Sequence, residues 1–192
     1  MDLMEACKVG NLEAVKFLVE EEGVDIDEAF TFAAENGHIE VVKYLVEQGA
    51  DIHANEEEAL RQAARNGHLE VVKYLAELGA DIHADDDDAL GWAAFNGHLE
   101  VVKYLVEQGA NVHVWDDDAL GLAAFNGHLE VVKFLIENGA DIDVLDLTDL
   151  HKLWSILSDE EMLPFLVSDK EEIREAAREY LESRKDGFNR SL

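Results

Sequence analysis

Apolar residues recur along the chain at the spacing of short amphipathic helices. Within residues 57–65, Leu60, Ala63 and Ala64 lie at i, i+3 and i+4, so they share one face of a helix. Residues 69–77 repeat this spacing with valine and leucine, and a glycine follows each stretch. The pattern predicts a pair of helices joined by a tight turn. Neither helix can bury its apolar face alone, so the pair must pack against copies of itself.

The helix pair is repeated along the chain with a constant period. The motif Asn-Gly-His-Ile/Leu-Glu at residues 36–40 returns at 66–70, 96–100 and 126–130, each time 30 residues later. A diverged earlier copy occupies residues 10–18. A fixed period of this length is typical of an array in which one helix-turn-helix unit is stacked on the next.

The repeated residues resemble the ankyrin repeat. Residues 59–64 (Ala-Leu-Arg-Gln-Ala-Ala) stand where that family has Thr-Pro-Leu-His-x-Ala-Ala, and residues 66–75 match its second helix. The resemblance covers about residues 1–145 and implies an all-α solenoid of ankyrin repeats with short hairpin loops. The period of 30 is shorter than the usual length of about 33, and the missing residues fall in the hairpin. Shortened repeats like these are abundant in giant viruses, and the same regularity is typical of a consensus-derived or redesigned protein.

The repeat pattern fades near residue 146, and a different helical segment follows. Residues 147–157 predict a helix, and Ser158 with Glu161 forms a capping box that opens the next one. We expect residues 1–146 to form the array, with a diverged first repeat and four regular units. Residues 147–192 are expected to form a helical cap over the last repeat, because terminal repeats in such arrays are atypical.

Acidic residues dominate the composition and are concentrated in the array. The chain has 44 acidic and 15 basic residues and a net charge of −29, and only eleven of those acidic residues lie in the predicted cap. Acidic runs at residues 56–58, 85–88 and 116–118 precede successive first helices, where the helix dipole favours negative charge. The remaining acidic residues are expected to form a ridge that attracts a basic partner. This charge argues against direct binding of nucleic acid, which requires clustered lysine and arginine.

Other features of the sequence indicate a cytoplasmic protein. No apolar run approaches the ~18 residues of a membrane span. The first five residues lack the basic and apolar stretches of a signal peptide. A single cysteine, Cys7, excludes an intrachain disulfide and is typical of a reducing compartment.

The histidines follow the period of the repeat and are predicted to be structural. One series comes after the Asn-Gly pair and the other lies in the hairpin; they comprise His38, His68, His98 and His128, and His53, His83 and His113. Each series is expected to form a column with a spacing of ~8–10 Å, whereas zinc requires ligands within ~2 Å of one ion. Hydrogen bonds in turns are therefore favoured over a metal site. The sequence contains no phosphate-binding loop, nucleophile elbow or zinc-protease motif, so we predict no cofactor and no enzymatic activity.

Some positions carry polar residues in the early units and aromatic residues in later ones. The last residue of the first helix is Glu35 or Arg65 in two units and Phe95 or Phe125 in the next two. A hairpin position changes from asparagine and aspartate to Trp115 in the same way. Since other units have polar residues at these positions, we expect that the fold does not require the three aromatic side chains.

The middle of the first helix changes in the same two units. Gly91 and Gly121 replace Arg61 there, at a cost in helix propensity of ~1 kcal/mol each. We interpret both glycines as positions that open space beside the aromatic residues.

The resemblance to ankyrin repeats assigns these residues to a binding surface. In that family, the hairpin tips and first helices line a concave groove that binds partner proteins. Carried over by position, the predicted partner-binding residues are Trp92, Phe95, Trp115, Leu122 and Phe125, with Asp86, Asp87 and Asp117 at the rim. Aromatic residues inside a charged rim are typical of an interaction hot spot.

The sequence therefore predicts a non-enzymatic protein-protein interaction module. Its partner is expected to present a basic surface and an apolar anchor. Three alternatives remain open at this point: a polyanion mimic that occupies the basic cleft of a nucleic-acid-binding protein, a designed scaffold without a natural partner, and a homodimer formed through the aromatic groove.

Overall fold

The computed structural model of the chain describes residues 1–20 and 25–189. Within these residues all regular elements are helices and there is no β-strand, as predicted for an all-α solenoid. The helices of the array are α1 (Leu3–Lys8), α2 (Leu12–Val19), α3 (Ile26–Glu35), α4 (Ile39–Glu47), α5 (Ala54–Arg65), α6 (Leu69–Glu77), α7 (Ala84–Phe95), α8 (Leu99–Glu107), α9 (Asp118–Phe125) and α10 (Leu129–Glu137). A 3₁₀ turn (Ile142–Val144) leads to α11 (Leu147–Trp154), α12 (Leu163–Leu166) and α13 (Glu171–Asn189).

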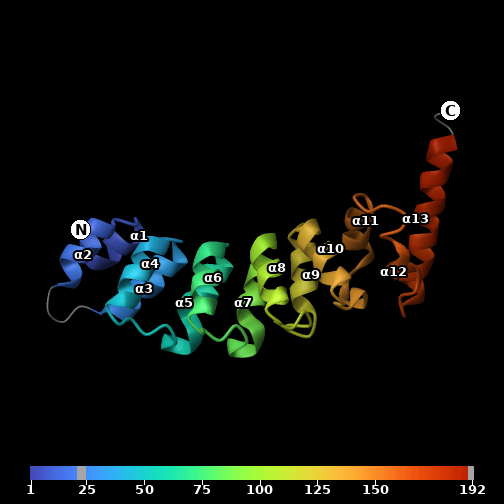
Figure 1. Cartoon of the computed structure of the whole chain (residues 1–192). Helices are drawn as coiled ribbons and strands as arrows, with labels where there is room; N and C mark the ends of the chain where they lie inside the picture. The colour runs from blue at the N-terminus through green and yellow to red at the C-terminus, as the bar shows by residue number, and fades with distance from the viewer. Residues whose placement is uncertain (21–24, 190–192) are drawn as a thin grey trace.

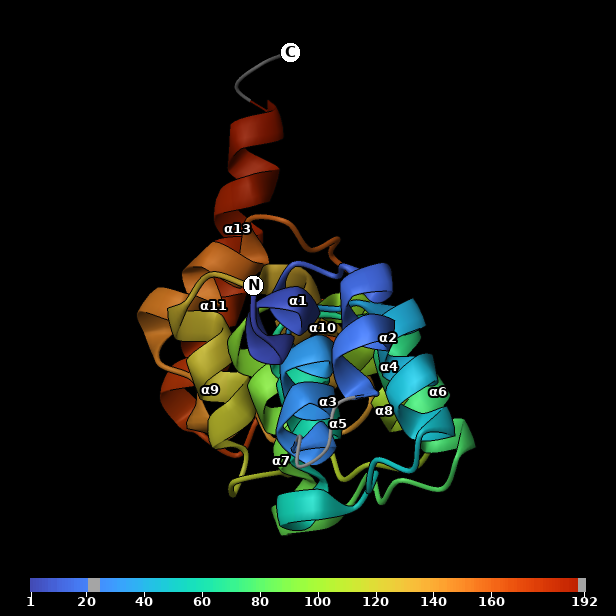
Figure 2. The same ribbon diagram turned by 90° about the vertical axis from the view of Figure 1, so that its left-hand side faces the viewer.

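The helices of the array form two parallel rows (Figure 1). Each first helix packs on the first helix of the next unit, so that α1, α3, α5, α7 and α9 make one row; α2, α4, α6, α8 and α10 make the other. Figure 2, which looks along the array, shows the two rows side by side, with the connecting hairpins projecting at one edge.

The apolar faces predicted from the spacing of leucine, valine and alanine form the core between the rows. Leu60, Ala63 and Ala64 of α5 are fully buried, and Val72 and Leu75 of α6 are buried against them. Burying each of the larger side chains contributes ~1.5–3 kcal/mol relative to leaving it in water. Because the same residues recur every 30 positions, one apolar core runs through the array.

The histidine after the Asn-Gly pair joins one unit to the unit before it at His38, His68 and His98. The Nε2–H of His68 donates to the backbone carbonyl of Glu35 at 2.9 Å, and that of His98 donates to the carbonyl of Arg65 at 2.9 Å. Since a carbonyl oxygen only accepts, Nε2 carries the proton in both rings. Burial lowers the pKa of His98, which favours this neutral form. The predicted structural role is confirmed for His38, His68 and His98.

The regular hairpins contain an unusual turn. Three consecutive residues have left-handed backbone in each regular hairpin: Asn55, Glu56 and Glu57; Asp85, Asp86 and Asp87; Trp115, Asp116 and Asp117. Such a conformation costs ~1–2 kcal/mol per residue for most L-amino acids. The acidic runs therefore lie mainly in a left-handed turn, and the right-handed helix starts only at their last residue.

The hairpin histidine and the end of each acidic run hold this turn together. His53 Nδ1 lies 2.6 Å from Glu57 Oε1, and His83 Nδ1 lies 2.8 Å from Asp87 Oδ1. His113 makes the equivalent contact with Asp117 at 3.0 Å. Hydrogen bonding to Glu57 raises the pKa of His53. The histidines of the hairpin thus also have the structural role predicted for them.

The C-terminal helices pack on the end of the array. α11 contacts α9 and α10, and the side chain of Trp154 is fully buried. Its ring lies edge-on to that of Phe165, with centroids 5.7 Å apart, and tilted against that of Tyr180 at 5.6 Å. The two hydrogen bonds of the capping box are present, since Ser158 N donates to Glu161 Oε2 and Glu161 N donates to Ser158 Oγ. They close a turn at residues 159–162, and the next helix begins only at Leu163.

Candidate functional site

An aromatic cluster lies on α7 and the following hairpin. We use the term for Trp92, Phe95 and Trp115. The ring of Trp92 is edge-on to that of Phe95, with centroids 5.5 Å apart, and edge-on to that of Trp115 at 5.6 Å. Edge-to-face contacts of this kind contribute ~0.5–1.5 kcal/mol beyond the area that they bury. The structure therefore brings together three of the predicted groove residues.

Trp92 is fixed by polar contacts on two further sides. Its indole Nε1–H donates to Asp88 Oδ2 at 3.1 Å. The guanidinium of Arg65, at the end of α5, lies 4.4 Å from the centre of its ring. A cation over an aromatic face is attracted by the ring quadrupole. Trp92 is consequently a half-buried residue that links two units rather than a freely exposed anchor.

Trp115 is part of the packing between units three and four. A Cβ atom added to Gly91 would lie only 2.5 Å from Trp115 Cζ2, and Trp115 packs against the apolar core. The indole of Trp115 fills the space that glycine leaves in α7, a packing role that the sequence did not predict for it. The interpretation of Gly91 is confirmed. A Cβ atom added to Gly121 would meet nothing within 4 Å, so Gly121 makes room for no side chain.

Phe125 is the predicted groove residue that is most open to solvent. It ends α9 and is 76% exposed, whereas Leu122, one turn earlier, is half-buried. The side-chain amide of the adjacent Asn126 donates to the carbonyl oxygen of Phe95 at 3.2 Å. This contact places the ends of α7 and α9 next to each other, so Phe125 follows Phe95 along the row of first helices.

The three predicted rim carboxylates differ in their surroundings. Asp86 is exposed, but Asp87 and Asp117 are each only 8% exposed and are paired with His83 and His113. Asp117 Oδ1 also accepts a hydrogen bond from Asp141 N at 3.0 Å. Asp87 and Asp117 therefore hold the hairpin in shape, and Asp86 presents its charge to solvent. In the sequence, the histidine four residues before Asp87 and before Asp117 is the feature that identifies them as carboxylates of the hairpin.

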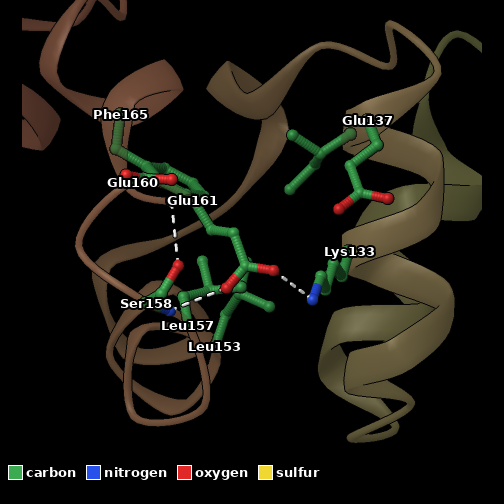
Figure 3. A pocket seen from close by; sticks show the side chains of 9 residues that line it. Lys133, Glu137, Leu153, Leu157, Ser158, Glu160, Glu161 and Phe165 are labelled. Atoms are coloured by element: carbon green, nitrogen blue, oxygen red, sulfur yellow. Dashed lines mark hydrogen bonds and ion pairs between the residues drawn. The ribbon is translucent and has the colours of Figure 1, made fainter.

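A second concave region, which the sequence did not indicate, lies between α10 and the C-terminal helices (Figure 3). It has a volume of about 470 Å³. Leu153, Leu157 and Phe165 form its apolar wall, and Lys133 of α10 forms an ion pair with Glu161 across it. This contact ties the last repeat to the segment that follows.

The ion pair makes the C-terminal segment sensitive to acid. Hydrogen bonds from Lys133 and Ser158 lower the pKa of Glu161 from 4.5 to about 2. A carboxylate with a lowered pKa contributes stability that is present above pH ~4.5 and is lost as the pH falls toward 2. We expect that lowering the pH from 5 to 3 reduces the advantage in melting temperature that the wild type has over Glu161→Gln.

The exposed neighbour Glu160 supplies the control, since Glu160→Gln removes the same charge without breaking the pair. Thermal unfolding followed by circular dichroism at both pH values measures the effect. An equal pH dependence of both variants would contradict the assignment of acid sensitivity to Glu161.

Within residues 1–20 and 25–189, no group of three or more histidine, cysteine, aspartate or glutamate side chains is arranged to hold a metal ion. The one cysteine, Cys7, is buried, and its burial raises its pKa to about 11. Among the described helices, none combines the length and the apolar character that crossing a membrane requires.

Comparisons with known proteins agree with this geometry. Two short matches come from spider proteins: alpha-latrotoxin-Lh1a of Latrodectus hasselti is 41% identical over 56 residues, 27% of this chain. Alpha-latrocrustotoxin-Lt1a of Latrodectus tredecimguttatus is 42% identical over 60 residues, 28% of this chain. In each case the match spans only 4% of the relative's own length. A family model described as ankyrin repeats in three copies matches residues 3–86 and 83–146. With helix pairs stacked in two rows over the same residues, the chain belongs to the ankyrin-repeat family.

Proposed function

We propose that the protein is a non-enzymatic binding module that holds a partner protein on the face formed by α7, α9 and their hairpins. Ankyrin repeats generally mediate protein-protein interactions. The observation that carries the proposal is Phe125, a large apolar side chain that is 76% exposed beside the aromatic cluster. Exposed apolar groups that adjoin further aromatic residues mark interaction sites on soluble proteins.

The negative charge of the chain indicates the charge of the partner's binding surface. With a net charge of −29, the protein attracts a basic surface and repels an acidic one. Asp86 in the hairpin next to the cluster is exposed. The partner therefore combines a basic surface with an apolar anchor that contacts Phe125. The chain has a single cysteine, which is buried, and this is consistent with a reducing, cytoplasmic setting.

The test compares Phe125→Glu with a matched control. Phe17 on α2 is 70% exposed but lies on the other row of helices, so Phe17→Glu makes the same chemical change outside the proposed face. Partners captured by the wild type are titrated against both variants by calorimetry. Truncating a central anchor costs ~2 kcal/mol or more, so we expect Phe125→Glu to bind at least ~30-fold more weakly.

Three outcomes are informative. If Phe125→Glu binds at least ~30-fold more weakly, Phe17→Glu retains its affinity within about twofold and both variants fold, the proposed face is supported. Equal weakening by both variants would contradict it. If Phe125→Glu binds like the wild type and affinity falls steeply with salt, the acidic residues carry the interaction and the protein acts as a mimic of a polyanion.

A further inference from the structure

A cavity with acidic walls lies between α3 and α5, on the row of first helices that also carries the aromatic cluster. Its volume is about 620 Å³. The side chains that matter for its chemistry are Glu28, Thr31, Phe32, Glu35, Asn55 and Glu58. Among the described residues that line it, none is a lysine or an arginine.

The same space one repeat later is filled by an arginine of the chain itself. Arg61 occupies the position of Thr31 in the next unit. Its Nη1 donates to Asp85 and Asp88, both at 3.1 Å, and its Nη2 donates to Glu58 at 2.6 Å. The guanidinium is therefore bound by three carboxylates from α5 and α7.

The residues that stand 30 positions before these acceptors line the cavity. Glu28 stands where Glu58 holds Arg61, Glu58 stands where Asp88 does, and Asn55 replaces Asp85. Glu58 is shared by the two places, and Glu35 adds a carboxylate where the next unit has Arg65. Both oxygens of Glu58 already accept hydrogen bonds, from Arg61 at 2.6 Å and from Gln62 at 2.8 Å. The cavity thus offers the carboxylates of Glu28 and Glu35 to a guanidinium, while threonine has replaced the arginine.

A third arrangement shows that the fold itself does not require this space to be open. Between α7 and α9 the indole of Trp115 packs over Gly91. The three intervals therefore contain an aromatic ring, an internal guanidinium and an open cavity. Of these three intervals, the one whose described residues leave an open volume has acidic walls and a short side chain, Thr31, where arginine would neutralise them.

We propose that this cavity binds the guanidinium of an arginine side chain presented by the partner protein. Arginine is the cation that pairs with carboxylates through a planar fork of donors, as Arg61 does in the neighbouring interval. Phe32 supplies an aromatic wall, and cations are attracted to aromatic faces. The role of the cavity in recognition rests on the proposed function, whereas its affinity for a guanidinium does not.

The experiment uses N-acetyl-arginine amide as the probe and the neutral isostere N-acetyl-citrulline amide as its control. Each is titrated into isotope-labelled protein and followed by NMR chemical shifts. We expect saturable shifts concentrated on residues that line the cavity for the arginine probe, and none there for citrulline. Shifts spread evenly over the acidic surface, or equal shifts with citrulline, would overturn the proposal.

Two pairs of variants test whether the probe binds in the cavity, and each pair compares a change in the cavity with the same kind of change elsewhere. Thr31→Arg copies Arg61 and should fill the cavity, so the probe should bind at least tenfold more weakly. Gln48→Arg adds the same charge at the end of α4, where it is exposed, and should change the affinity less than twofold. Glu28→Gln should weaken binding at least threefold, while the exposed Glu47→Gln should leave it unchanged.

These results are independent of the partner. If Thr31→Arg binds the probe as well as Gln48→Arg does, the cavity is not the site, whatever Phe125→Glu does to partner binding. If the probe result holds but Thr31→Arg leaves the affinity for the captured partner unchanged, the arginine that enters the cavity does not come from that partner, and the partner-recognition part of the proposal is overturned.

Discussion

Replacing Trp154 by alanine should destabilise the end of the molecule by ~3–5 kcal/mol, the range measured for removing a large aromatic side chain from a core. Trp154 is fully buried and packs edge-on against Phe165 and tilted against Tyr180. The neighbouring α12 is short and packs on α13.

Loss of this packing should also expose the apolar face of α9 and α10, since terminal repeats protect an array from association. We therefore expect Trp154→Ala to unfold at a lower urea concentration and to elute as larger species in size-exclusion chromatography. Ile156, which is 45% exposed, provides the control: Ile156→Ala should change stability by less than ~0.5 kcal/mol. A monomeric Trp154→Ala chain with unchanged stability would show that the C-terminal helices do not protect the array.

Replacing Gly67 by alanine should be more damaging than replacing Gly127, although both have a φ of +78°. Alanine in the left-handed region costs ~1–2 kcal/mol at either position. At Gly67 the new Cβ would lie 2.5 Å from His98 Nδ1, whereas at Gly127 it would meet nothing within 4 Å. Overpacking typically adds ~1–3 kcal/mol, so the two variants should differ by about 2 kcal/mol in the free energy of unfolding.

A double-mutant cycle with His98→Ala isolates the contact. Removing the imidazole should relieve the clash, so Gly67→Ala should cost less in the His98→Ala background than in the wild type, by ~0.5–3 kcal/mol of coupling. Urea unfolding of the four chains measures this difference. Additive effects, or equal losses at Gly67 and Gly127, would contradict the view that glycine is needed there for the close approach of the next unit.

The comparison of the aromatic residues shows where prediction from the sequence stopped. Trp115 and Phe125 looked alike, because each replaces a polar residue of earlier units. The structure separates them: Trp115 packs over Gly91 and against the core, while Phe125 is 76% exposed. Gly91 was visible in the sequence, but Gly121 was equally visible and makes room for no side chain. Whether an aromatic ring packs over the glycine depends on the path of the hairpin that carries the ring.

The acidic runs show the same limit. Their position before each first helix is consistent with capping of the helix dipole, and the sequence does not reveal that three successive residues take left-handed backbone. That conformation turns Asp87 and Asp117 inward to His83 and His113 and leaves Asp86 exposed. A run of identical side chains thus divides into structural and exposed carboxylates.

The sequence by itself determined the helix pairs, their period, the residues of the core and the family, because an apolar face that recurs every 30 residues can be buried only by stacking. It also indicated the structural role of both histidine series. Only the tertiary structure decided which aromatic side chain is exposed and which interval between first helices is open. Those outcomes depend on contacts between residues of different units, such as Arg61 with Asp88, which are 27 positions apart, or Trp115 with Gly91, which are 24 positions apart. The local pattern around each residue does not indicate which side chain the next unit places beside it.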